Sequence, residues 1–283
     1  MTPSPFASPE DVAARLAAVG YLGDEDLATA IFLAFALGRP RLLEGAPGGG
    51  KTEVARALAS ALGRQPVRLQ CYEGLDAAAA LYEWNHARQL VAARGGEAEL
   101  YGDEFLIERP LLRAVRNPGG VVLLVDEIDR ADDAFEALLL EFLSDFQISI
   151  PERGTVAAAH PVPVVLTSNR TRELHDALRR RCLYHFIGYP DAAREAAILR
   201  LRHPGLAETA AERLVAAVAA VRTLPIGKRP GISETIDWAA GAAALSAGGV
   251  AWPEALRRSL GLLVKDEEDL ATVARADILR ELA

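Results

Sequence analysis

The sequence predicts an α/β fold: a three-layer αβα domain on a parallel sheet, followed by a small all-helical domain. Short aliphatic runs without polar alternation predict strands covered on both faces. Helical patterns separate these runs as far as residue 190, which favours right-handed crossovers. From Asp191 onward only helical patterns occur. We therefore expect an αβα core over 10–190 and a helical domain over 191–283.

The N-terminal elements are predicted from prolines and helix-capping residues. Residues 1–9 contain three prolines and predict a flexible arm. Helices are expected to begin after Ser8 and at Asp24, because both side chains cap helix N-termini. Gly38 is expected to end the second helix after Leu37.

Five runs are candidate strands of the sheet: 41–45, 67–70, 121–125, 162–167 and 184–187. A helix is expected over 51–62, where apolar residues recur every four positions, and another around the apolar stripe 135–146, with Asp132 as its cap. Residues 148–156 predict a β-hairpin around 151–154.

Composition indicates a soluble globular protein. Hydrophobic residues make up 51% and charged residues 25% of the chain. Lysine and arginine number 31 against 39 acidic residues, so the net charge is −8. An acidic chain is a poor default partner for nucleic acid or an anionic membrane. The two cysteines, Cys71 and Cys182, and a start without a secretory pattern predict free thiols in a cytoplasmic protein without membrane insertion.

A phosphate-binding loop is predicted between the first strand and the next helix. The pattern G-x-x-x-x-G-K-[ST] is matched by Gly45, Ala46, Pro47, Gly48, Gly49, Gly50, Lys51 and Thr52. Glycines let backbone N–H groups face phosphates, and the helix adds its positive end. We expect Lys51 to reach the β and γ phosphates of ATP and the Thr52 hydroxyl to bind Mg²⁺.

Two further strands end in residues suited to hydrolysis. Asp126 and Glu127 follow the run 121–125 at the edge where ligands bind in parallel sheets. Asp126 is expected to hold Mg²⁺ and Glu127 to polarise the attacking water; the alternative is a simple helix cap. Asn169 follows the run 162–167 and is expected to contact the γ phosphate or the water. Its alternative is turn chemistry.

Three adjacent arginines, Arg179, Arg180 and Arg181, cannot all face one direction. A solvated charged surface is one interpretation. The other is an arginine that reaches the ATP of a neighbouring subunit, which requires a ring.

These motifs resemble the AAA+ ATPases, and within them the MoxR family. The similarity includes VVLLVDEIDRA (121–131) and the predicted hairpin. The stretches TSNRTRELHDALRRRC (167–182) and LYEWN (81–85) are similar to accessory ATPases for maturation of molybdenum- and copper-containing carbon monoxide dehydrogenase.

The resemblance implies a P-loop AAA+ αβα core with a helical lid and a hexameric ring that binds ATP and Mg²⁺ at subunit interfaces. An insert after the second strand, at about residues 73–96, is implied as well. It also implies a chaperone role in metalloenzyme maturation, with a molybdenum hydroxylase as client and a von Willebrand A-type partner. Arg181 matches the arginine finger best, with Arg180 second. The lid departs from the family, because Thr235 stands where many relatives carry a sensing arginine; Lys228 or Arg229 is a possible substitute.

Other candidates have simpler interpretations. His160, His175, Cys182 and His185 lack a second tight ligand pair, so no metal site besides Mg²⁺ is expected. Tyr82 and Trp84 are candidate client contacts, although a core role is equally compatible with their sequence. Two function classes compete with the remodelling ATPase: a nucleotide-gated binding module with incidental hydrolysis, and a DNA motor, which the charge of −8 disfavours.

Overall fold

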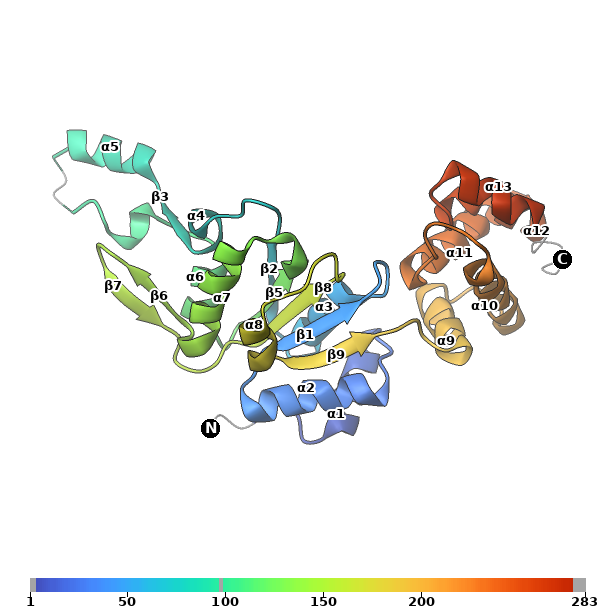
Figure 1. Ribbon diagram of the computed structural model, residues 1–283, viewed down its shortest axis with the longest axis horizontal. Helices are drawn as coiled ribbons and strands as arrows, with labels where there is room; N and C mark the ends of the chain where they lie inside the picture. The colour runs from blue at the N-terminus through green and yellow to red at the C-terminus, as the bar shows by residue number, and fades with distance from the viewer. Residues whose placement is uncertain (1–3, 97–98, 277–283) are drawn as a thin grey trace. The chain divides into compact units, whose positions relative to one another are not determined.

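The computed structural model describes residues 4–96 and 99–276. The chain divides into two compact units (Figure 1). The first comprises residues 1–45 and 51–186, and the second comprises residues 46–50 and 187–283. The change between units falls close to residue 190, where the sequence pattern changes.

The first unit is built on a five-stranded sheet with the order β2-β5-β8-β1-β9. Its strands are β1 (Arg41–Gly45), β2 (Gln65–Gln70), β5 (Val121–Asp126), β8 (Val164–Ser168) and β9 (Leu183–Ile187). The ladders β2–β5, β5–β8 and β8–β1 are parallel, with Leu124 opposite Val165 in the central pair. All five predicted strands are present, and the predicted fold class is confirmed.

The central strand β5 is covered on both faces. Val121, Leu123 and Val125 join a core cluster that includes residues of α6 and α7. Val122 and Leu124 point to the opposite face, because side chains alternate along a strand, and they are equally buried. This double burial explains why the sequence shows five consecutive aliphatic residues here.

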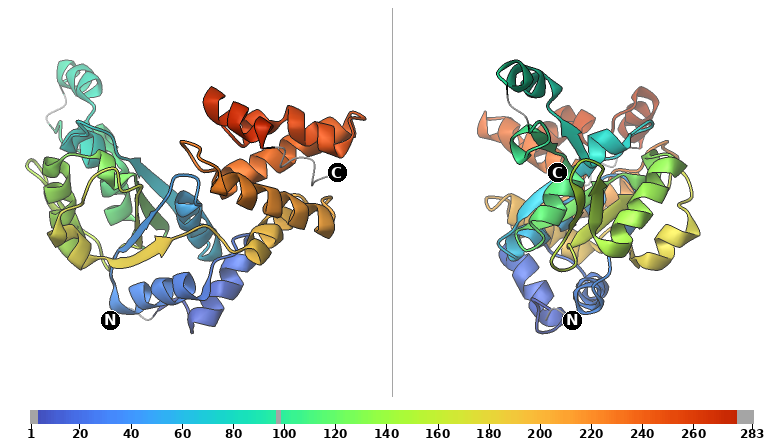
Figure 2. Two further views of the ribbon diagram at one scale, coloured as in Figure 1. Left: turned by 45° about the vertical axis from the view of Figure 1, so that its right-hand side comes forward. Right: turned by 90° about the vertical axis from the view of Figure 1, so that its left-hand side faces the viewer.

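Helices flank the sheet, and the blue helices α1 and α2 lie together beside it (Figures 1 and 2). The flanking helices are α1 (Pro9–Ala18), α2 (Glu25–Leu37), α3 (Lys51–Ala61), α6 (Pro110–Arg116), α7 (Asp133–Asp145) and α8 (Asp176–Arg181). The predicted caps are confirmed: Ser8, Asp24 and Asp132 each accept a hydrogen bond from a backbone N–H of the first turn. Gly38 ends α2 in the left-handed conformation.

The predicted N-terminal arm is anchored in part. Residues 1–3 lie outside the described residues. Phe6 is buried and its ring packs edge-on against Phe35, at 5.3 Å between centroids. This part of the arm is therefore packed rather than flexible, because Phe6 contributes apolar area to the core.

A two-stranded insert and a hairpin extend from the sheet. The insert contains α4 (Ala77–Ala80), β3 (Tyr82–Trp84), α5 (His86–Arg94), η1 (Asp103–Phe105) and β4 (Leu106–Glu108). It extends beyond the predicted range 73–96, because β3 pairs antiparallel with β4. The predicted hairpin is confirmed as β6 (Gln147–Ile150) and β7 (Gly154–Ala157).

Side chains join the insert to the hairpin. The indole N–H of Trp84 donates to Glu152 Oε2 at 3.4 Å. Asp103 is 2.5 Å from both Arg153 of the hairpin turn and Arg116 of α6. Trp84 is 9% exposed and belongs to the core cluster, so its role is packing.

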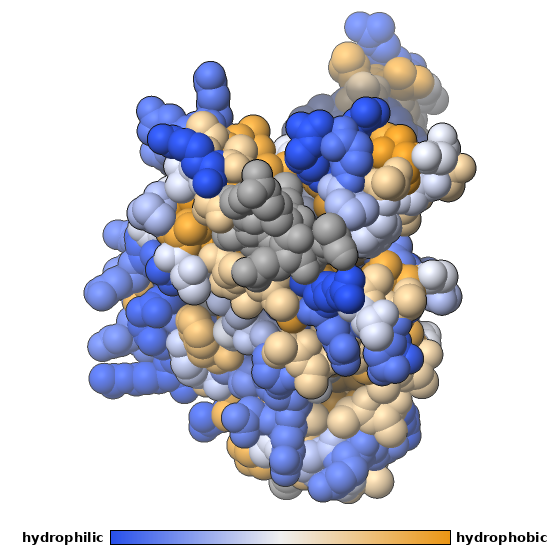
Figure 3. Space-filling view, turned by 90° about the vertical axis from the view of Figure 1, so that its right-hand side faces the viewer, coloured by the Kyte–Doolittle hydropathy of each residue, from blue (hydrophilic) through white to orange (hydrophobic). Residues whose placement is uncertain are grey.

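The second unit is helical throughout its described part. It contains α9 (Ala192–Arg202), α10 (Glu208–Thr223), α11 (Ile232–Ala247), α12 (Trp252–Arg258), η3 (Leu260–Leu262) and α13 (Glu267–Arg275). The fully buried Trp238 lies in its core and donates to Leu256 O at 2.9 Å. On the face that Figure 3 shows, hydrophilic and hydrophobic residues are intermixed. Among the described residues of the whole chain, none of the helices combines the length and apolarity that a membrane span requires.

Candidate functional site

The predicted phosphate loop joins β1 directly to α3. Gly48 and Gly50 adopt φ angles of 75° and 87°, a region that side chains with a Cβ rarely occupy. Within the loop, the Gly49 N–H donates to Ala46 O at 3.2 Å. The glycines of the motif therefore meet a backbone requirement that other residues meet only with strain.

Lys51 begins α3 and is 7% exposed. Its Nζ donates to Gly45 O at 2.7 Å. Burial lowers the pKa of Lys51, while the charges of Asp129, Asp126 and Glu127 act in the opposite direction. A buried ammonium group beside three carboxylates at the end of a phosphate loop is suited to binding an anion that brings its own metal ion.

Asp126 ends β5 and is 2% exposed. Its Oδ1 accepts from the Thr52 hydroxyl at 3.1 Å, and Thr167 donates to the same oxygen. Its Oδ2 is 2.6 Å from Arg68 Nη2. The motifs did not identify Arg68 and Thr167. Both contact Asp126 of β5, but Arg68 lies on β2 and Thr167 on β8, so neither is close to Asp126 in the sequence.

The pair of Thr52 and Asp126 fits Mg²⁺. Both side chains offer hard oxygen atoms, and Mg²⁺ in phosphate sites takes one or two protein ligands beside water and phosphate oxygens. Asp126 Oδ1 and the Thr52 hydroxyl are adjacent, so one ion can reach both. Arg68 engages the other carboxylate oxygen and is the cation with which Mg²⁺ would compete.

The backbone of Glu127 is left-handed, directly after β5 ends at Asp126. Its φ of 55° lies in the left-handed region, which costs a non-glycine residue about 1–3 kcal/mol. Its N–H donates to the Thr167 hydroxyl at 2.9 Å. Its carboxylate accepts from Gln70 Nε2 at 2.9 Å and from Asn169 Nδ2 at 3.3 Å. The helix-cap alternative does not hold, since Glu127 makes no side-chain cap and Asp132 caps α7.

Asp129 anchors the segment after β8, and the motif analysis gave it no role. It is 3% exposed. Its carboxylate accepts from the Asn169 N–H at 3.1 Å, the Thr171 N–H at 2.8 Å and the Thr171 hydroxyl at 2.7 Å. The signal was present in the sequence as a second aspartate three positions after Asp126 in a buried stretch.

The arginines at the end of α8 project in different directions. Arg179 lies over the Tyr184 ring, with Cζ 5.8 Å from the centroid. Arg180 is 3.9 Å from Asp176, and both side chains are more than four-fifths exposed. Arg181 is exposed, and the part of the chain that the structure describes shows it in no ion pair within 4.0 Å.

In the second unit, Thr235 is an interior residue. It is fully buried, and its hydroxyl donates to Glu195 Oε1 at 3.1 Å or Gly231 O at 3.0 Å. Glu195 also pairs with Arg222 at 2.8 Å. Lys228 lies 3.6 Å from Glu234, and Arg229 is exposed. Thr235 therefore completes a buried polar network instead of presenting a side chain to a ligand.

The structure brings five predicted side chains into one connected network at the carboxyl edge of the sheet: Lys51, Thr52, Asp126, Glu127 and Asn169. Within one subunit, the ion pairs of the described residues do not join Arg180 or Arg181 to this network. Over residues 4–96 and 99–276, His, Cys, Asp and Glu form no group of three or more that could hold a metal ion by themselves.

One solved structure supports this fold. A point variant of RuvB from Thermotoga maritima superposes with a TM-score of 0.50 and 21% identity, over 92% of this chain and 71% of that one. The RuvB Holliday junction branch migration motor from the same organism gives 0.49 and 21%, over 87% and 70%. No curated protein matches the chain.

Residues 40–182 match the family model for the AAA domain of the dynein-related subfamily. The match covers half of the chain, from the residue before β1 to the end of α8, and includes the whole site network. The chain therefore belongs to the dynein-related subfamily of AAA domains.

Proposed function

We propose that this protein is a Mg²⁺-dependent ATPase that converts ATP to ADP and phosphate. The arrangement of Glu127 carries the proposal. Its carboxylate is fixed by amide groups of Gln70 and Asn169, beside the Asp126–Thr52 pair and the buried Lys51. A carboxylate held by amides, next to a site for a metal-bound phosphate, is suited to accepting a proton from water.

The side chains divide the work. Lys51 and the N–H groups of the phosphate loop bind the phosphates, while Thr52 and Asp126 would hold Mg²⁺. When bound, Mg²⁺ would screen the charge on the phosphate oxygens. Glu127 orients the attacking water and accepts its proton. Asn169 keeps Glu127 aimed and offers an N–H donor towards the γ phosphate.

Hydrolysis is proposed to remodel a protein client from a cytoplasmic homo-oligomeric ring, most simply a hexamer. An exposed Arg181 that shows no ion pair among the described residues supports a finger acting in trans. We further propose a client of the molybdenum hydroxylase class and a von Willebrand A-type partner. The support is the resemblance of 167–182 and 81–85 to accessory ATPases for carbon monoxide dehydrogenase.

The variant Glu127→Gln tests the ATPase. It should bind ATP and hydrolyse it about a hundredfold or more slowly, because general-base catalysis contributes that much. Steady-state phosphate release and ATP binding are measured on the same preparation. Glu141→Gln is the matched control, since Glu141 is exposed on α7. Hydrolysis at the wild-type rate by Glu127→Gln would contradict the mechanism.

One observation favours a second candidate, the nucleotide-gated binding module. Thr235 is buried in the second unit, at the position where the resemblance expects a sensing arginine. A remodelling enzyme should hydrolyse ATP faster when the client class is added. A binding module should show unchanged turnover with client at every protein concentration, while its oligomeric state still follows ATP.

A further inference from the structure

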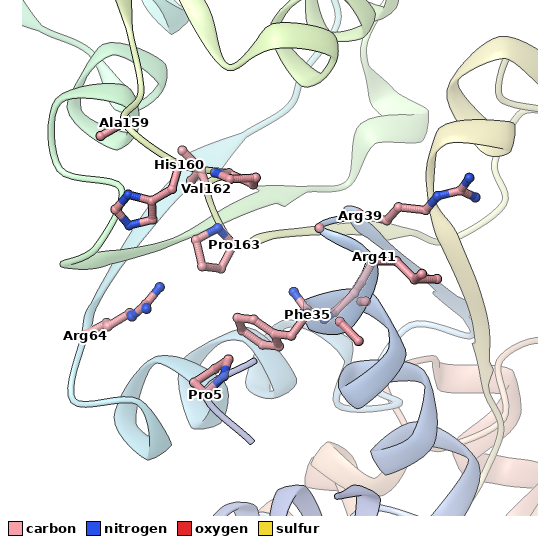
Figure 4. Close-up of a pocket in the computed structure, with 14 residues that line it drawn as sticks. Pro5, Phe35, Arg39, Arg41, Arg64, Ala159, His160, Val162 and Pro163 are labelled. Atoms are coloured by element: carbon pink, nitrogen blue, oxygen red, sulfur yellow. The ribbon is translucent and has the colours of Figure 1, made fainter. Parts of the chain in front are cut away.

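A cavity lies at the amino-terminal end of β1, and the phosphate loop follows the carboxyl-terminal end of the same strand. Its volume is about 500 Å³, which is within the range of small-molecule pockets. It is lined by the end of α2, the start of β1, the residue before β2 and the segment before β8. Figure 4 shows Pro5, Phe35, Arg64, His160 and Pro163 around it.

This site is separate from the nucleotide network. Arg41 is the first residue of β1, and Gly45, which opens the phosphate loop, is the last. At about 3.3 Å per residue the two ends of this strand lie about 13 Å apart. Asp126 and Asn169 also lie at or just after the carboxyl ends of their strands. The residues that line the cavity therefore include no member of the nucleotide network.

Arg41 is the unexplained group in the cavity wall. It is 2% exposed, and its guanidinium lies over the Phe35 ring with Cζ 4.0 Å from the centroid. Its buried Nε has no hydrogen-bond partner, and Nη2 reaches Ile31 O only at 3.4 Å. No carboxylate pairs with Arg41 within 4.0 Å among residues 4–96 and 99–276.

A second cation adds to the cost of this charge. Burial, together with the smaller effect of the charge of Arg64, lowers the pKa of Arg41 to about 9. A buried cation without a paired anion destabilises a fold by several kcal/mol in general. Proteins normally pair such groups, and the contacts of Arg41 with Phe35 and Ile31 O leave its charge without a counter-charge.

Capping of α2 does not account for Arg41. Cations do favour helix C-termini. However, the Gly38 N–H already donates to Phe35 O at 3.3 Å, and the Arg39 N–H donates to Ala34 O at 2.9 Å. Two carbonyls of the last turn of α2, Ala34 O and Phe35 O, therefore have backbone donors, and the guanidinium group of Arg41 reaches Ile31 O one turn earlier.

We propose that this cavity binds a small carboxylate with an apolar or aromatic body. The planar fork of Arg41 matches a carboxylate, and Arg64 supplies a second charge. Phe35, Val162 and Pro163 line the rest of the space and suit the apolar body. The cavity is separate from the site of ATP hydrolysis. If no carboxylate binds in the cavity, the proposed ATPase activity is therefore unaffected.

Calorimetry with phenylacetate on the full chain tests the proposal. Saturating ADP and Mg²⁺ occupy the phosphate loop, so that binding there does not contribute. We expect one saturable site per chain. The neutral isostere phenylacetamide should bind at least about tenfold more weakly, because it cannot pair with a guanidinium group.

Two variants locate the site. Arg64→Gln and Arg41→Met should each weaken phenylacetate binding about tenfold or more. Arg56→Gln, an exposed arginine of α3 with the same change in charge, should not. Without ligand, Arg41→Met should keep or raise the melting temperature, because it removes a buried unpaired charge.

The proposal is overturned if phenylacetate shows no saturable binding, or if phenylacetamide binds equally well. Equal binding by wild type and Arg64→Gln would also overturn it. If Arg41→Met fails to fold, Arg41 is a structural residue, and Arg64→Gln alone then decides whether the cavity takes an anion.

Discussion

Asp129 connects the two strand ends that carry Glu127 and Asn169. It lies two residues after Glu127 and accepts hydrogen bonds from the backbone at Asn169 and Thr171. Because Asn169 in turn donates to Glu127, the position of the Glu127 carboxylate, the proposed base, depends on Asp129 through Asn169. We regard Asp129 as a positioning residue.

Asp129→Asn should lower the free energy of unfolding by about 1–3 kcal/mol, because buried N–H donors lose a charged acceptor. Its kcat should fall more than its KM for ATP changes, since Lys51 and the phosphate loop keep their positions and lose only the nearby charge of Asp129. Urea denaturation and steady-state kinetics measure the two effects. Asp145→Asn, exposed on α7, is the control. An unchanged kcat in Asp129→Asn would remove its positioning role.

At this scale the sequence predicted residues whose partners are close in the chain. Lys51 and Thr52 follow their loop directly, and Asp126 with Glu127 ends a recognisable strand. Arg68 was not found, because its contact with Asp126 exists only after β2 pairs with β5. Phe6 was misjudged for the same reason, since Phe35 lies on another helix.

At the scale of elements, residues 169–175, between β8 and α8, connect the site network to the arginines at the end of α8. Arg172 within it donates to Ala131 O at 3.0 Å and pairs with the buried Glu136 of α7. The His175 N–H donates to Glu136 at 3.0 Å. These contacts hold the start of α8, the helix that ends in Arg181.

A mixing experiment tests whether Arg181 acts on a neighbouring subunit. Lys51→Ala should lose ATP binding but keep its finger, while Arg181→Ala should bind ATP without efficient hydrolysis. Each alone should be nearly inactive, and a mixture of the two should regain ATPase activity. Mixing Lys51→Ala with Arg180→Ala serves as the comparison.

Recovery only in mixtures with Arg181→Ala assigns the finger to Arg181. If Arg181→Ala is fully active alone, the role passes to Arg180 or is absent. The sequence could not decide between them, because adjacent residues on a short helix differ mainly in direction.

The strands of the main sheet were predictable from the sequence, and the two short strands of the insert were not. β1 is buried at every position and β5 is aliphatic throughout, so neither needs a partner to be recognised. β3 and β4 have three residues each. Strands this short carry too little periodicity to be identified, and only their pairing defines them.

At the scale of the whole molecule, two buried thiols tie stability to alkaline pH. Burial, joined at Cys71 by the charges of nearby carboxylates, raises the pKa of both Cys71 and Cys182 to about 12. Between pH 9.0 and about pH 12 the unfolded chain loses these protons while the folded chain keeps them. Stability should therefore fall as pH rises through this window.

Urea midpoints across that window measure the effect. The double variant Cys71→Ala/Cys182→Ala should show a shallower decline, because the thiol contribution is gone and all other titrations remain. The native thiols should also resist a chromogenic disulfide reagent until the protein unfolds. Equal pH slopes for wild type and the double variant would contradict this prediction.

The bridge between insert and hairpin has a mechanical consequence. Trp84 and Asp103 tie these two projections together, and Asp103 also holds Arg116 of α6. A polypeptide gripped by either projection would pull on both, and the load would pass through α6 to the sheet strands that α6 contacts, β2 and β5. Tension on a captured chain would thus arrive at Gln70 and Asp126, where those strands end.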